Sequence, residues 1–269
     1  MQREDYESLH ALEAKFWWFA GMREITAALM DPLLPRSRDR MILDAGCGTG
    51  GNLEWLRRYA GNGNVVGIDL VTDAISFCAE SGSSPLAQAS VTHLPFADSS
   101  FDLITSFDVL VQLPGDDADD ESIREMYRVL RPGGNTFVRV AAYEWMRSGH
   151  DEALGTKRRY SLPVLQQKLK RAGFRLRRAT YANGMLLPLA AFNRLVLKPT
   201  GLMSKGSDVK PLPSHLQWLD GLMRTALSGE ARWLDRAGAR LPVGLSAICI
   251  AEKPLDRIPK IPGSFLTSV

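Results

Sequence analysis

The stretch Ile42-Leu43-Asp44-Ala45-Gly46-Cys47-Gly48-Thr49-Gly50 joins a short apolar run to a segment with helical periodicity. Glycine tolerates positive φ and has no side chain, so a turn of this composition lets the backbone approach a ligand closely. The next apolar run ends at Asp69, 19 residues after Gly50. An acidic residue at about this distance meets a ribose diol in nucleotide-binding α/β folds. Strand, turn, helix, strand and acid in this order predict a nucleotide-type site.

The chain around this turn alternates short apolar runs with amphipathic segments. We expect strands in RMILDAG, NVVGIDL, PLAQAS, FDLITSFDVL, NTFVRVAAY, FRLRRATYA and LSAICIAEK, and helices over 52–59, 72–81, 121–130 and 162–172. Such alternation implies right-handed crossovers and a parallel sheet. The predicted fold is a Rossmann-like α/β domain, with a seven-stranded, mostly parallel sheet and helices on both faces.

Two segments fall outside the alternation. Residues 1–35 carry apolar positions at steps of three and four, which predict an N-terminal helical flap with a helix break at Gly21. Residues 183–245 hold apolar helical stretches joined by a linker rich in glycine, proline and lysine, which predicts a helical cap inserted before the last strand. The expected organisation is flap 1–35, core 36–182, cap 183–245, and last strand with tail 246–269.

Composition excludes several classes of protein. With 269 residues, 45% hydrophobic and 23% charged, the chain is long and apolar enough for one large domain or a core with an insertion. Its three cysteines lie far apart without a CxxC or Cys/His cluster, which predicts no metal site, no disulfide framework and a reducing, cytoplasmic setting. The polar, acidic start and the lack of a long apolar run predict neither a signal peptide nor a membrane span.

The glycine-rich turn resembles a known motif. Its GxGxG spacing, led by Asp44, is similar to the first motif of class I S-adenosylmethionine-dependent methyltransferases and differs from the GxGxxG of NAD enzymes. Leu94-Pro95-Phe96 with Phe101-Asp102, and VLRPGG at 129–134, resemble two later motifs of that family. The resemblance covers roughly residues 40 to 140. It implies an enzyme that uses S-adenosyl-L-methionine and releases S-adenosyl-L-homocysteine.

The same resemblance implies the cofactor contacts. Asp44 would lie near the methionine part, Asp69 would accept hydrogen bonds from the ribose hydroxyls, and Phe107 would flank the reacting methyl group. Ser90 stands where many relatives carry an aspartate for the adenine amino group, so this contact is expected to be weaker. The full expected set is Asp44, Gly46, Cys47, Gly48, Asp69, Leu70, Ser90, Val91, Phe107, Tyr6 and Arg23.

A looser resemblance, to a bacterial subgroup of type 11-like methyltransferases, spans nearly the whole chain. It rests on FWWF at 16–19 with Arg23, on RRY at 158–160, and on the late turn LPVGLS at 241–246. Separately from this resemblance, the flap residues Tyr6, Trp17 and Trp18 are expected to close over the cofactor. The alternative is an amphipathic helix that docks on the core.

Candidate catalytic residues follow the fifth predicted strand. His150 is the candidate general base, Tyr160 the candidate for positioning a substrate hydroxyl or amine, and Arg159 with Arg158 the candidate clamp for a carboxylate or phosphate. The alternatives are a solvated loop histidine, a packed tyrosine and a surface charge run. Methyl transfer is an in-line displacement, so orientation and exclusion of water suffice unless the nucleophile carries a proton.

Three functions stay open. The first is methylation at O, N or C of a small, partly apolar or aromatic metabolite, with a small-molecule or lipid-linked partner, no nucleic acid, and a monomer or homodimer. The second is methylation of RNA or protein, which the basic set Lys168, Lys170, Arg171, Arg175, Arg177 and Arg178 motivates. The third is a non-catalytic homologue that keeps the cofactor fold.

Overall fold

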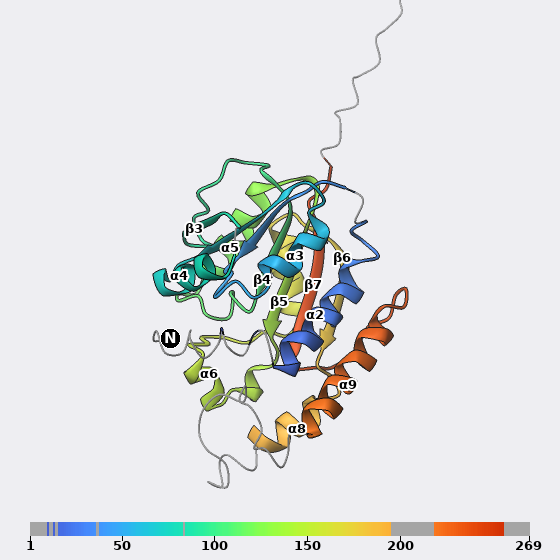
Figure 1. The fold of residues 1–269 in the computed structure, drawn as a ribbon. Helices are drawn as coiled ribbons and strands as arrows, with labels where there is room; N and C mark the ends of the chain where they lie inside the picture. The colour runs from blue at the N-terminus through green and yellow to red at the C-terminus, as the bar shows by residue number, and fades with distance from the viewer. Residues whose placement is uncertain are drawn as a thin grey trace, which may run out of the picture.

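The computed structural model describes residues 10, 13, 16–35, 38–82, 84–194 and 218–255. Its centre is a seven-stranded sheet with the strand order β3-β2-β1-β4-β5-β7-β6 (Figure 1). All neighbouring strands are parallel except β7, which runs antiparallel to both β5 and β6. This is the predicted Rossmann-like sheet. Its strands are β1 (Met41–Ala45), β2 (Asn64–Asp69), β3 (Leu86–Gln88), β4 (Phe101–Phe107), β5 (Leu130–Ala141), β6 (Arg175–Ala182) and β7 (Ser246–Glu252).

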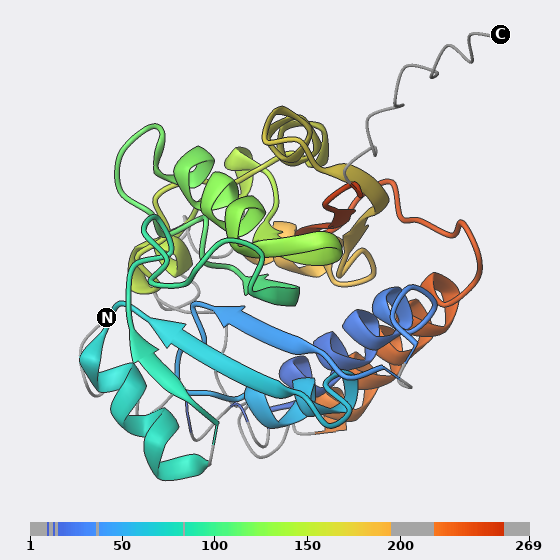
Figure 2. The ribbon, with the colours of Figure 1, turned by 90° about the horizontal axis from the view of Figure 1, so that it is seen from above.

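Helices cover both faces of the sheet (Figure 2). Successive residues of a strand point to opposite faces, so Leu43 and Ile104 enter one core cluster while Ile42 and Leu103 enter the other. The first cluster is closed by α5 (Ala118–Val129) and α7 (Leu162–Arg171). The second is closed by α2 (Trp17–Met30), α3 (Leu53–Leu56), η1 (Arg57–Tyr59), α4 (Thr72–Ser81) and α9 (Trp218–Leu234).

The carboxyl ends of the parallel strands share one edge of the sheet, toward which the β5 arrow points in Figure 1. The first turn of α2, the short helices α6 (Gly149–Ala153) and α8 (Leu187–Phe192), and η2 (Glu144–Met146) lie at this end. Asp108, Tyr143 and Asn183, which follow β4, β5 and β6, all have φ near +60°. Backbone of this kind is uncommon for residues other than glycine, and it turns the chain sharply at the edge where α/β folds bind ligands.

Element boundaries differ from the sequence expectations in a few places. The helix over 72–81 is confirmed as α4, whereas α5 begins at Ala118, three residues before the expected start at Glu121. Strand β5 begins at Leu130 rather than near Asn135, because Leu130 already pairs with Phe101 before a register shift. The VLRPGG segment is therefore largely the irregular start of a strand.

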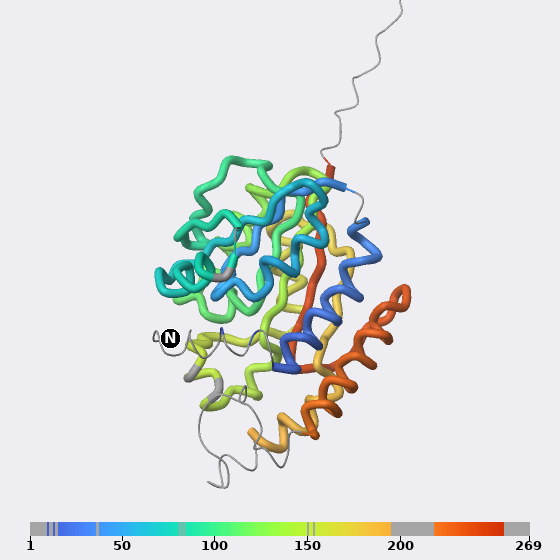
Figure 3. Tube along the Cα trace, in the orientation of Figure 1, coloured from blue at the N-terminus to red at the C-terminus, as the bar shows by residue number. Residues whose placement is uncertain are grey.

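The expected helix break at Gly21 is wrong. Helix α2 runs unbroken through this residue, which is buried where α9 packs alongside (Figures 1 and 3). A Cβ atom on Gly21 would lie 2.4 Å from Leu227 Cδ1 and 2.8 Å from Leu227 Cβ. The glycine thus permits close approach of two helices. Helix α9, from the segment expected to form a cap, contributes Leu227, Ala231 and Leu234 to the same core cluster as α2.

Replacing Gly21 by alanine is expected to destabilise the fold by about 1–3 kcal/mol, because the added methyl group overpacks the contact with Leu227. Chemical denaturation measures the change. The double variant Gly21→Ala/Leu227→Ala should recover part of the loss relative to the sum of the two single variants. A single Gly21→Ala variant as stable as the parent would refute this account of the packing.

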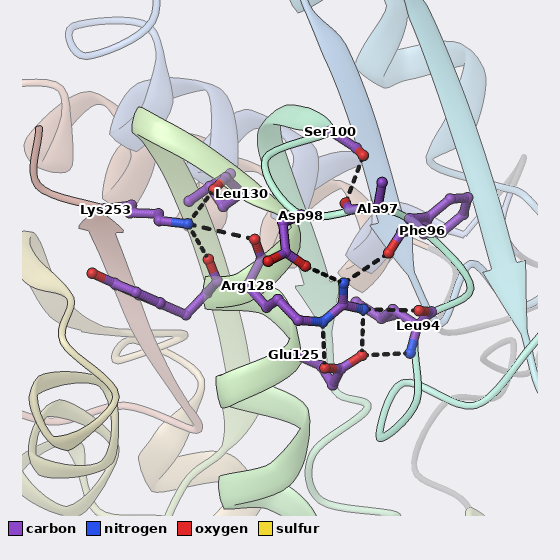
Figure 4. Close-up of polar contacts among 10 residues, drawn as sticks. Leu94, Phe96, Ala97, Asp98, Ser100, Glu125, Arg128, Leu130 and Lys253 are labelled. Atoms are coloured by element: carbon purple, nitrogen blue, oxygen red, sulfur yellow. Dashed lines mark hydrogen bonds and ion pairs between the residues drawn. The ribbon is translucent and has the colours of Figure 1, made fainter. Parts of the chain in front are cut away.

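Arg128, near the end of α5, fixes the loop between β3 and β4 (Figure 4). Its guanidinium donates to the carboxylates of Glu125 and Asp98 and to the carbonyls of Leu94 and Phe96, all at 2.7–2.9 Å. Hydrogen bonds to the two carboxylates raise the pKa of Arg128, so it stays charged. The network fixes the segment from Leu94 to Asp98, which follows Ser90 and Val91 along the chain.

Candidate functional site

The glycine-rich turn leaves β1 at the carboxyl edge of the sheet. Gly46, Gly48 and Gly50 adopt φ values of +89°, +56° and +88°. A Cβ atom on Gly46 would lie 2.3 Å from Val109, and one on Gly50 would lie 2.6 Å from Cys78. At Gly48 no atom of the described residues lies within 4 Å of that position. The backbone at Gly48 therefore faces open space, as close approach of a ligand requires.

Cys47 is part of this turn, and its side chain is buried beneath it. Its thiol is buried, with its Sγ atom 3.7 Å from the Sγ of Cys78, and both thiols are free. The hydrogen bond with Cys78 and burial raise the pKa of Cys47, so it stays a neutral thiol. The buried side chain supports the turn from within, and backbone hydrogen bonds of Cys47 to Ile68 and Gly50 fix the turn's shape.

Asp44, the last but one residue of β1, is fully buried. The hydroxyl of Thr105 donates to its Oδ1 atom at 2.7 Å, while its Oδ2 atom has no hydrogen-bond partner among the described residues. Burial is the main cause that raises the pKa of Asp44 to about 7, with smaller contributions from the carboxylates of Glu13 and Asp69. A buried carboxyl oxygen without a partner suits a ligand that donates hydrogen bonds or carries positive charge.

Asp69 ends β2 beside the turn. Its Oδ2 atom accepts the N–H of Gly48 at 2.9 Å, and its Oδ1 atom accepts the N–H of Val71 at 3.0 Å. The two bonds hold the carboxylate between the turn and the start of α4. Each oxygen has a further lone pair, so the group can still accept hydrogen bonds from a diol.

The residues expected around adenine follow β2 and β3. Leu70 is 64% exposed and Val91 is buried, so one apolar side chain is open to a ligand and the other belongs to the core. The Ser90 hydroxyl lies 2.8 Å from the Thr92 hydroxyl and accepts the N–H of Thr92 at 3.2 Å. Ser90 therefore stabilises its own loop, although its hydroxyl keeps some capacity for a ligand.

A cation between aromatic rings lies at the same edge. The guanidinium of Arg139, on β5, lies 5.1 Å from the Phe107 ring and 5.2 Å from the Trp18 ring. It forms an ion pair with Asp108 at 2.7 Å and is nearly buried. This contact brings the first turn of α2 onto the ends of β4 and β5. Sequence reasoning missed Arg139, for which the available signal was a charge inside the apolar strand pattern FVRVAA.

The flap also reaches the glycine-rich turn through Glu13, which sequence reasoning missed as well. The carboxylate of Glu13 accepts the hydroxyl of Thr49, and Arg23 donates to the carbonyl of Glu13 at 3.3 Å. Burial raises the pKa of Glu13 and lowers that of Arg23. Arg23 thus lies on the flap beside the turn. Tyr6 lies outside the described residues.

Tyr160 and Arg159 lie in internal networks rather than at an open face. The Tyr160 hydroxyl donates to Asp119 at 2.6 Å, and Arg159 donates to Asp151 at 2.7 Å and to the carbonyl of Ala142 at 2.9 Å. Both carboxylates are buried and need donors, which is why these side chains turn inward instead of toward a substrate as expected. The contacts fix the loop after β5.

His150 lies on α6, at the carboxyl edge. Nothing further about its side chain is described. Its role as a general base therefore stays a prediction from the sequence.

Several members of the basic set form ion pairs. Lys168 pairs with Asp120 at 2.9 Å, and Arg175 and Arg177 pair with Glu252 at 2.9 and 2.6 Å. Arg175 and Arg177 belong to the first half of β6, toward the sheet edge opposite the glycine-rich turn. Within the described residues, no group of three or more His, Cys, Asp or Glu side chains is placed to hold a metal. Nor does any described helix combine the length and apolarity needed to cross a membrane.

Comparison with known proteins indicates a methyltransferase domain. A family model described as a methyltransferase domain matches residues 43–138. The fatty-acid O-methyltransferase of Mycolicibacterium smegmatis is 33% identical over 123 residues, which are 43% of this chain and 44% of that protein. A tRNA (carboxymethyluridine(34)-5-O)-methyltransferase of Arabidopsis thaliana is 31% identical over 120 residues, 44% of this chain and 27% of that protein. The chain spans less than half the length of such relatives.

A solved S-adenosylmethionine-dependent methyltransferase from Mesorhizobium loti shares the fold. Its TM-score is 0.52 at 17% identity, with 85% of this chain and 99% of that chain covered. The glycine-rich turn, the strand order and the matched domain agree with one another. Residues 43–138 therefore form a methyltransferase domain, and the sheet around them has the fold of S-adenosylmethionine-dependent methyltransferases.

Proposed function

We propose that this chain binds S-adenosyl-L-methionine at the carboxyl edge of the sheet and transfers its methyl group to a small acceptor. The observation that carries the proposal is the open face of Gly48, whose N–H bonds to the Asp69 carboxylate, together with the unpartnered Oδ2 atom of the neighbouring Asp44. A ligand with a cationic amino-acid end and a ribose diol matches these groups. When bound, the cofactor supplies a methyl group activated by the sulfonium.

The residues of the chain divide this task. Asp44 and the backbone of Gly48 bind the methionine part, and Asp69 binds the ribose. Leu70, which is exposed, contacts the adenine ring, whereas Val91 is buried in the core and does not sandwich the ring as expected. These contacts are expected to orient the cofactor. Correct orientation supplies much of the rate enhancement of an in-line displacement.

Phe107, Trp18 and Arg139 form the wall where the acceptor would lie. The rings and the stacked guanidinium exclude water, and Asp108 holds Arg139 in place. His150 is proposed to take a proton when the acceptor carries one. An acceptor that is already ionised needs no such base.

A small, partly apolar acceptor is supported by the surface near this edge. Met185, Leu189 and Phe192, in and next to α8, are 61%, 54% and 53% exposed. Exposed apolar side chains of this kind suit an apolar or lipid-linked molecule. The ion pairs of the basic set and its position toward the opposite edge favour this class over RNA.

Incubation with methyl-labelled S-adenosylmethionine tests the proposal. The acceptors to compare are fatty acids, acyl thioesters, phenols and bulk tRNA. Label in an apolar small molecule is expected. Label only in tRNA would replace the proposal with the RNA alternative, and cofactor binding without transfer to any acceptor would favour a non-catalytic homologue.

Replacing Asp69 by alanine should weaken binding of S-adenosylhomocysteine by about 1–3 kcal/mol, because charge-assisted hydrogen bonds to the ribose are lost. Titration calorimetry measures the change. The matched control is Glu80→Ala, which removes an exposed carboxylate from α4. Equal affinities of the Asp69→Ala variant and the parent would show that the ribose does not lie at Asp69.

A further inference from the structure

We infer that Glu13 binds the α-ammonium group of the cofactor, so that the flap selects ligands with an amino-acid end. The inference rests on the proposed function and deepens it. It concerns a residue that lies 36 positions from Thr49 along the chain, yet contacts the turn directly.

Glu13 packs against the glycine-rich turn and forms hydrogen bonds with it. The hydroxyl of Thr49 donates to its Oε2 atom, and the backbone N–H of Gly51 also bonds to its carboxylate. A Cβ atom on Gly51 would lie 2.5 Å from that Oε2 atom and 3.1 Å from the Cβ of Glu13. A side chain at position 51 would displace the Glu13 carboxylate, so glycine there lets the acid from the flap approach the turn.

Three carboxyl groups lie near the turn, and Arg23 interacts with one of them, Glu13. The carboxyl groups of Glu13, Asp44 and Asp69 are close enough to interact with one another electrostatically. The nearby cation Arg139 already pairs with Asp108 at 2.7 Å. A cationic ligand group among the three acids would relieve their repulsion.

An ammonium group has three donors and therefore needs several acceptors. The unpartnered Oδ2 atom of Asp44 is one acceptor on the sheet side of the turn. Glu13 brings a second carboxylate from the flap side. Two acids from opposite sides match an ammonium better than either acid alone.

Arg23 supplies the positive charge that matches the carboxylate of the cofactor's amino-acid end. Its guanidinium donates to the carbonyl of Glu13 at 3.3 Å and interacts electrostatically with the Glu13 carboxylate. A guanidinium suits the carboxylate of an amino acid. The flap therefore carries one anionic and one cationic side chain for the two charges of the cofactor's amino-acid end.

Neutralising Glu13 would change the ligand affinity in the opposite direction if its carboxylate merely mimics the carboxylate of the cofactor. In that case its carboxylate occupies a place that the ligand must take. Neutralising Glu13 would then tighten binding. The direction of the change in affinity therefore separates the two roles.

The experiment compares S-adenosylhomocysteine with 5′-methylthioadenosine, which lacks the amino-acid end. Both ligands are titrated into the parent, Glu13→Gln and the control Glu80→Gln by calorimetry. Glu13→Gln is expected to weaken S-adenosylhomocysteine by at least about tenfold and to change 5′-methylthioadenosine by less than about twofold. The control should match the parent for both ligands.

Binding of 5′-methylthioadenosine in the same sample shows that the variant is folded. An equal loss for both ligands, or unchanged or tighter binding of S-adenosylhomocysteine, would overturn the role of Glu13. A parent protein that binds neither ligand would instead overturn the proposed function. The two failures are thereby distinguished.

Discussion

Replacing Gly48 by valine is expected to abolish cofactor binding while the protein still folds. The residue has φ of +56°, so a side chain costs about 1–2 kcal/mol in backbone strain. Apart from its own residue and chain neighbours, no atom of the described residues lies within 4 Å of a Cβ at this position, so the protein leaves space there. The valine side chain would instead fill the space that the ligand needs. Calorimetry with S-adenosylhomocysteine, together with denaturant unfolding, measures both effects.

Gly238→Val is the matched control. Gly238 also has positive φ, +75°, and open space around a Cβ, but it follows α9 away from the turn. It should show a similar loss of stability with unchanged affinity. If Gly48→Val bound the ligand as tightly as the parent, the cofactor would not lie against this turn.

The stability of the ligand-free protein is expected to fall as pH rises through about 7, because of Asp44. Burial raises the pKa of this group from 3.8 to about 7, so the folded state holds a proton that the unfolded state releases. The contribution of this proton to the free energy of unfolding is fully present below about pH 4 and is lost as pH rises through 7. Its upper bound is about 4 kcal/mol.

Asp44→Asn isolates this contribution, because asparagine is neutral and its oxygen can still accept the Thr105 hydroxyl. The variant should become increasingly more stable than the parent as pH is raised from about 5 to 8, as urea unfolding would show. It should also bind S-adenosylhomocysteine more weakly at pH 8, since the negative charge that the ammonium requires is gone. A stability difference that does not change with pH would contradict the raised pKa.

The succession of strands and helices along the chain followed directly from the sequence. Apolar runs alternate with amphipathic helices, and a turn with positive φ at Gly46, Gly48 and Gly50 needs glycine, so both features are visible locally. The seven-stranded, mostly parallel sheet is confirmed, and the antiparallel direction of β7 is a finding of the structure. The cofactor contacts expected at Asp44 and Asp69 stay predictions, supported by their positions beside the turn.

Contacts between distant segments were not predictable. Gly21 reads as a helix breaker on its own, because the reason for a glycine there is Leu227, more than 200 residues later. Glu13 reads as one polar residue of an amphipathic helix until Thr49 and Gly51 are placed against it. Such pairs depend on tertiary packing, which local periodicity does not encode.

The substrate side was the least predictable part for a similar reason. Arg159 and Tyr160 carry chemistry that suits catalysis, but their donors turn toward the buried carboxylates of Asp151 and Asp119. Arg139 lies in a strand and reads as an interior position, yet its guanidinium stacks between Phe107 and Trp18 at the site. Residue type alone did not indicate which charges were already paired.

Equilibrium dialysis of labelled S-adenosyl-L-methionine against the purified protein is the most direct measurement of cofactor binding at the carboxyl edge. Saturable binding of about one molecule per chain, lost in Gly48→Val and retained in Gly238→Val, is the expected result. No retention of the label at millimolar cofactor, or equal retention by Gly48→Val and the parent, would contradict it.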